Sequence, residues 1–173
     1  MFAGGWTLEG SEAVGSGAGV AQSEVLDLLS GLVEKSLVVV KRGDEGPVGY
    51  RLLEPIRQYA LEKLEESGAV ELALRAHAQY FLALAEEAEP ELLGPREDQW
   101  YERLEQEHDN IRAALSCSLE GAHPELGLRL AGAIWWFWHR HGHGIHRYLL
   151  SCGKSRSAPE TIRASRASVP PMR

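Results

Sequence analysis

The sequence predicts a mainly α-helical protein with one β-hairpin near its amino terminus. Most of the chain carries apolar residues every three or four positions, the spacing of amphipathic helices. Two short runs rich in β-branched and apolar residues flank a Gly/Asp/Pro-rich connector, which is typical of a hairpin. With 173 residues and 44% hydrophobic content, the chain can bury a core. The order helix, hairpin, antiparallel helices favours a winged-helix-like unit followed by stacked helices.

The amino-terminal elements follow from local signals. Residues 23–35 form an apolar stripe with Ser23 as the expected N-cap. We expect Leu26, Leu29 and Val33 of this stripe to pack onto the next helix. The hairpin joins residues 37–40 to residues 50–53, with "KRGDEGPVG" forming a long tip.

The remaining helices are bounded by Pro and Gly. Pro55 suits the first position of a helix and Gly68 suits its stop. A longer helix is predicted over 70–88, and the segment from Pro90 to Pro95 breaks it. Two more helices are predicted, over 97–119 and 124–139. The last is apolar nearly all round, because Trp135, Trp136 and Trp138 widen its apolar face, so other helices must cover it.

The formal net charge of −7 is unevenly distributed. Residues 151–173 contain five basic residues and one acidic residue, whereas residues 1–150 contain 13 Lys or Arg and 24 Asp or Glu. So acidic a body repels a phosphate backbone, and counterion release is the main source of generic DNA affinity. Broad nucleic-acid binding is therefore disfavoured.

Cysteine usage and hydropathy indicate a cytoplasmic protein with no membrane segment. Cys117 and Cys152 have no CxxC spacing, which fits a reducing compartment. No apolar run approaches the roughly 20 residues that span a bilayer. The start, "MFAGGWTLEG", has neither the basic nor the apolar region of a signal peptide.

Six stretches of residues 2–143 form a recognisable series: "FAGGWTLEGSEAV", "VLDLLSGLVEKSLVVV", "YRLLEPIRQYALEKLEESG", "HAQYFLALAEEAEPEL", "LEQEHDNIRAALSCSLE" and "LGLRLAGAIWWFWHRHGH". In order and spacing they resemble one segment of large bacterial LuxR-type and related NB-ARC (STAND ATPase) transcriptional regulators. In those proteins the segment lies just after the nucleotide-binding module.

The resemblance implies a non-catalytic signal-relay and protein-interaction segment. In that family a winged-helix subdomain closes over the nucleotide site, and the following helices begin a tetratricopeptide-like (TPR-like) array that senses a signal or partner. The implied organisation is a winged-helix-like subdomain at 1–68, a TPR-like segment at 69–146 and a disordered tail at 147–173. No GxxxxGK[ST] phosphate loop is present, so we expect no cofactor. The expected partners are neighbouring regulator domains or other proteins, and the oligomeric state stays open.

Two departures from the family pattern are visible. The family has a further helix before the position of Phe2, so we expect the winged-helix-like unit to lack its first helix and to expose apolar surface. After His143 the family continues with a charged, Leu/Trp-spaced helix, which the residues that follow here do not match. The change to a basic composition suggests an aberrant, frameshifted carboxyl terminus.

The segment "WWFWHRHGHGIH" admits three interpretations. His139, His143 and His146 have the spacing of a helical zinc site, but Gly142 and Gly144 disfavour a helix and no acid orients the imidazoles. Base stacking on the tryptophans would need a basic groove. We therefore favour core packing at a helix end, with the uncovered part of Trp135, Trp136 and Trp138 as a docking surface for a partner protein.

DNA binding through a winged helix is the alternative function. Residues 23–35 would be the recognition helix and Lys41 with Arg42 the wing, but Glu24, Asp27 and Glu34 make that helix acidic. Catalysis is not expected either. Cys117 lies mid-helix and is predicted to be a buried small residue, and neither His77 nor His108 has a placed nucleophile.

Overall fold

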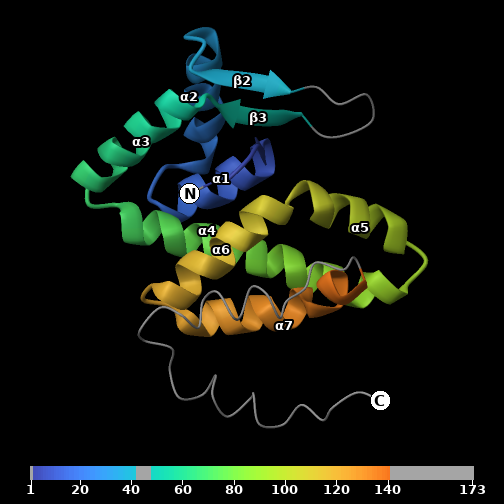
Figure 1. The fold of residues 1–173 in the computed structure, drawn as a ribbon. Helices are drawn as coiled ribbons and strands as arrows, with labels where there is room; N and C mark the ends of the chain where they lie inside the picture. Colours follow the sequence, from blue (N-terminus) through green and yellow to red (C-terminus); the bar gives the residue numbers. More distant parts are fainter. Residues whose placement is uncertain (1, 42–47, 141–173) are drawn as a thin grey trace.

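The computed structural model of the protein describes residues 2–41 and 48–140. Helices dominate this part of the chain and a small antiparallel sheet lies beside the amino-terminal helices (Figure 1), which confirms the mainly α-helical prediction. In chain order the elements are β1 (Trp6–Thr7), α1 (Leu8–Gly17), α2 (Gln22–Glu34), β2 (Val38–Lys41), β3 (Gly49–Leu52), α3 (Glu54–Glu66), α4 (Val70–Ala88), the 3-10 helix η1 (Glu89–Leu93), α5 (Glu97–Gln106), α6 (His108–Glu120) and α7 (Pro124–Arg140).

The amino-terminal elements form a winged-helix-like unit. Strands β2 and β3 make the predicted hairpin, with Val38 opposite Leu52 and Lys41 opposite Gly49. The sheet has a third strand that the sequence did not predict, because β1 pairs antiparallel with β3 and gives the order β1-β3-β2. Helices α1 and α2 are joined by residues 18–21, where Gly19 adopts a φ of +96° that favours glycine.

Helix α1 was not predicted, because its glycines weaken the apolar stripe. It forms because the Thr7 side chain caps its start, accepting a hydrogen bond from the Gly10 N–H at 3.1 Å. Val14 is buried inside the fold. At the carboxyl end, a Cβ added to Gly17 would lie 2.4 Å from the Cβ of Ala76 on α4. A glycine at this position therefore lets α1 and α4 approach closely.

Helix α2 differs from its prediction in two ways. It starts at Gln22 after Ala21, which makes no side-chain capping bond, so Ser23 is not the N-cap. The predicted packing of α2 onto α3 is wrong as well. Leu29 is buried, but Leu26 is 47% exposed, because the main contacts of α2 are with α1 and β2.

The helices that follow agree with the sequence prediction except at one residue. Helix α4 covers the predicted range. Gly68 follows the end of α3 and has a φ of +71°, as expected for a glycine that stops a helix. The prediction of one helix over 97–119 is wrong, because Glu107 has φ −96° and ψ 4° and separates α5 from α6. Its carboxylate takes part in the polar contacts described below.

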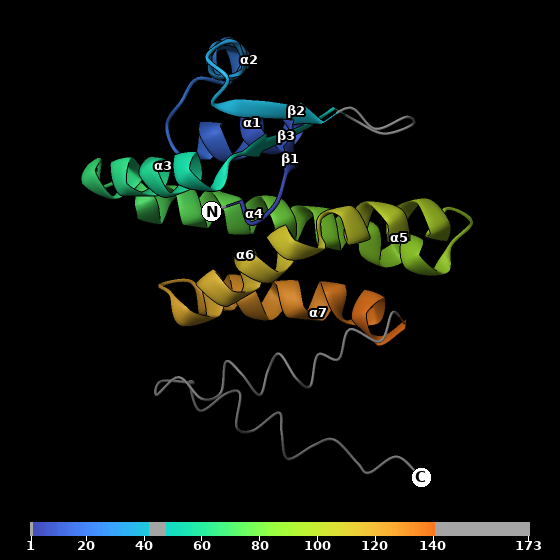
Figure 2. The same ribbon diagram turned by 45° about the horizontal axis from the view of Figure 1, so that its top comes forward.

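The main core lies among α4, α6 and α7, which pack against one another in successive layers below the sheet (Figure 2). Its largest fully buried side chains include Phe81, Leu104, Ile111, Leu115, Ile134 and Phe137. A smaller cluster of Trp6, Leu29 and Val38 lies under the sheet. Phe2 packs against both clusters. Among the described residues, no helix is both long and apolar enough to cross a membrane.

The α1–α4 contact gives a direct stability test. Replacing Gly17→Ala should lower the free energy of unfolding by about 1–3 kcal/mol, because the new methyl group overlaps Ala76. The matched control is Gly31→Ala on α2, where a Cβ meets nothing within 4 Å. That change should stabilise by about 0.5–1 kcal/mol through helix propensity. Urea unfolding measures both, and equal stability of the two variants would contradict the close approach.

Candidate relay interface between the winged-helix-like unit and the helical segment

Asn110 fastens the amino-terminal strand region to the helical segment. It lies on α6 and is 2% exposed. Its Oδ1 accepts a hydrogen bond from the Ala3 N–H at 2.8 Å, and its Nδ2 donates to the Gly5 carbonyl at 2.8 Å. The same Nδ2 donates to Oε2 of Glu107 at 2.7 Å. Sequence-distant backbone groups are thereby held by a single buried amide.

The charged groups beside Asn110 surround this contact. Burial raises the pKa of Glu107, and the hydrogen bond from Asn110 opposes that shift. Arg103 on α5 lies 3.3 Å from Glu9 on α1. This pair is solvent-exposed, so it contributes at most about 1 kcal/mol. The buried amide therefore holds the junction more firmly than the ion pair does.

Aromatic rings complete the junction on the side of α4. The Phe2 ring stacks on Trp6 with centroids 5.3 Å apart, and meets the His77 imidazole edge-on at 5.1 Å. His77 in turn lies 4.8 Å from the Phe81 ring. Offset and edge-to-face pairs of this kind add about 0.5–1.5 kcal/mol beyond the area that they bury. The amino-terminal segment is therefore anchored by ring packing as well as by Asn110.

His77 is a neutral core residue. It is 2% exposed, and its Nε2 has no hydrogen-bond partner among the described residues. Burial lowers the pKa of His77 to about 3. An imidazole with so low a pKa stays uncharged near neutral pH, so it serves as an aromatic packing group between Phe2 and Phe81.

The three tryptophans singled out in the sequence do not lie together on one surface. Trp135 is 47% exposed and stacks on the exposed His139 with ring centroids 4.9 Å apart. Trp136 is half-buried. Trp138 is 4% exposed and belongs to the main core. The helical period of 3.6 residues explains this division, because successive side chains point about 100° apart.

The other candidate residues are placed as follows. His143 and His146 lie outside the described residues, so their predicted spacing with His139 stays a prediction. Cys117 is exposed, which corrects its prediction as a buried residue, because it lies on the outer side of α6. The ring of His108 approaches Phe137 and Trp138. Within residues 2–41 and 48–140, no group of three His, Cys, Asp or Glu residues could hold a metal ion.

Sequence reasoning missed Asn110 and Glu107, although a signal was present. Asn is a poor residue for a helix interior, because its side chain competes for backbone hydrogen bonds. Asn110 nevertheless stands next to Ile111 on the buried stripe of α6. A polar residue on an apolar stripe indicates a buried hydrogen-bonding role. Its partners, Ala3 and Gly5, could not be inferred, since they lie more than 100 residues away.

The geometry defines a protein in which a winged-helix-like unit is hydrogen-bonded to, and packed against, a helical segment. The chain is similar to part of several larger mycobacterial proteins. It is 40% identical over 146 residues to a "Putative HTH-type transcriptional regulator" of Mycobacterium tuberculosis and to its counterpart in Mycobacterium bovis, covering 82% of this chain and 16% of each relative. An "Uncharacterized protein" of Mycobacterium tuberculosis is 42% identical over 81 residues, or 46% of this chain and 20% of that protein.

The chain thus spans about 16% of the length of the regulators that it matches. No protein-family profile matches the chain, and no solved structure matches it. The similarity covers 82% of the present sequence, so it includes residues of both the winged-helix-like unit and the helices that follow it.

The low pKa of His77 predicts a specific acid sensitivity. The unfolded imidazole binds a proton below pH 6.5 whereas the folded one does so only near pH 3, so stability falls as the pH drops through this window. Between pH 7.5 and pH 5 the native protein should lose about 2 kcal/mol more unfolding free energy than His77→Leu. Urea titrations at both pH values measure this difference. Parallel losses in the two proteins would contradict the assignment.

Proposed function

We propose that this chain is a non-catalytic relay and protein-interaction segment of a nucleotide-regulated transcriptional regulator. The observation that carries the proposal is the buried clamp of Asn110 on Ala3 and Gly5. A displacement of the winged-helix-like unit pulls on α6 through this amide, and α6 packs directly on α4 and α7. The names of the mycobacterial relatives support a place within a transcriptional regulator.

Transmission by packing suits the physical character of this junction. Helices that share a dense core move as bodies, because interiors are packed too tightly to absorb a local shift. Gly17 on α1 touches Ala76 on α4, so a second contact couples the same two parts. Together these contacts give the winged-helix-like unit two points of attachment to the helical segment.

The far end of the relay would be the exposed part of α7. Trp135 offers a large apolar ring to solvent, Trp136 forms its half-buried border, and Trp138 anchors the helix from inside the core. Tryptophan is enriched among the residues that dominate protein–protein binding energy. A partner protein or a neighbouring regulator domain that contacts Trp135 would therefore press on a helix that is continuous with the core.

The relay is tested by the variant Asn110→Ala. Removing the amide leaves the Ala3 N–H and the Gly5 carbonyl without their hydrogen-bond partner, which should lower the free energy of unfolding by about 2–4 kcal/mol. Hydrogen exchange of the amides in β1 and α1 should accelerate together with those of α6. The matched control is Gln106→Ala at an exposed position of α5, which should leave exchange unchanged. Faster exchange confined to α6 would contradict the relay.

A second candidate function is DNA binding by the winged-helix-like unit. It is favoured by the helix pair α1–α2 with its adjacent hairpin, and by the HTH-type names of the relatives. Charge opposes it. Helix α2 carries three acidic residues and no basic one between Gln22 and Glu34, and a groove-reading helix needs Arg, Lys, Asn or Gln at its contacts.

A gel-shift titration on a DNA duplex at low salt separates the two functions. At about 10 µM protein, where ordinary non-specific binding is detectable, the chain should leave the duplex unshifted. The variant carrying Glu24→Lys and Asp27→Lys is the positive control, because it converts the exposed side of α2 to a cationic one. A shift by the native chain that weakens steeply with added salt would support DNA binding over the relay.

A further inference from the structure

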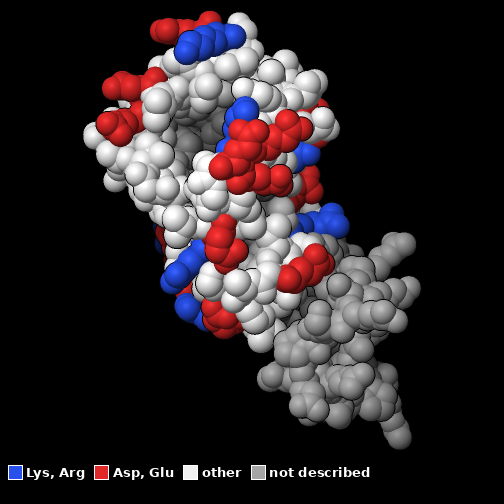
Figure 3. All heavy atoms as spheres, turned by 90° about the vertical axis from the view of Figure 1, so that its left-hand side faces the viewer, with Lys and Arg blue, Asp and Glu red and all other residues white. Residues whose placement is uncertain are grey.

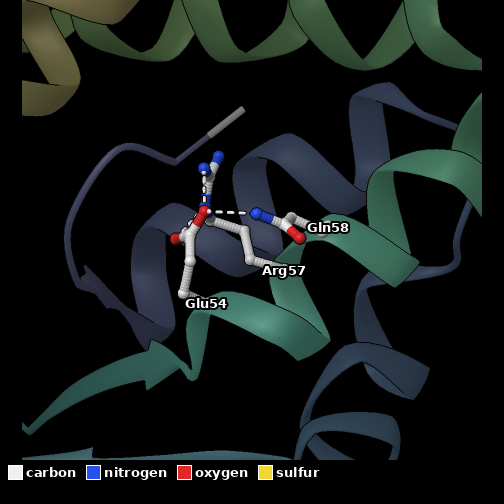
Figure 4. A network of polar contacts seen from close by, with 3 residues as sticks. All are labelled: Glu54, Arg57 and Gln58. Atoms are coloured by element: carbon white, nitrogen blue, oxygen red, sulfur yellow. Dashed lines mark hydrogen bonds and ion pairs between the residues drawn. The ribbon is translucent and has the colours of Figure 1, made fainter.

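We draw no further inference here: the strongest candidate, the open apolar groove of about 320 Å³ between α2 and α3 (Figure 3), which Arg57 lines while it is paired with Glu54 at 2.7 Å (Figure 4), carries none, because nothing in the described part of the chain shows what covers it.

Discussion

One buried amide holds the two parts of this molecule in register. Asn110 satisfies the Ala3 N–H and the Gly5 carbonyl while it is itself shielded from water. A buried polar group costs free energy unless all of its hydrogen bonds are made, so this arrangement is favourable only in one relative placement of the strand region and α6. Apolar packing around Phe2 adds stability, but it lacks this directional requirement. The amide therefore sets the geometry that the core then stabilises.

The sequence predicted those helices whose ends are marked by proline or glycine. Pro55, Gly68 and the apolar periodicity of residues 70–88 locate α3 and α4, because proline and glycine restrict the backbone wherever they occur. Helix α1 and strand β1 were missed for the opposite reason. The glycines of α1 weaken its apolar stripe, and its packing on α4 rests on the close approach of Gly17 to Ala76, while the two-residue strand depends on pairing with β3. Neither contact leaves a local pattern in the sequence.

The candidate site was harder to predict than the fold. Tryptophans attract attention by composition, yet the fold divides them, with Trp138 in the core and Trp135 exposed. Asn110 is a single polar residue in an apolar stripe, and its role depends on backbone groups near the amino terminus of the chain. The break at Glu107 was missed as well, although its carboxylate accepts a hydrogen bond from Asn110 only three residues along the chain. The contacts of Asn110 with Ala3 and Gly5, by contrast, join residues more than 100 positions apart. Long-range pairing of this kind is absent from a one-dimensional pattern.

The position of Phe2 has a thermodynamic consequence. Its ring is shared by the cluster under the sheet and by the main core among the helices. Unfolding of either cluster would remove part of the packing around Phe2 and so weaken the other cluster. We therefore expect the two clusters to unfold in one cooperative transition and not in two successive ones.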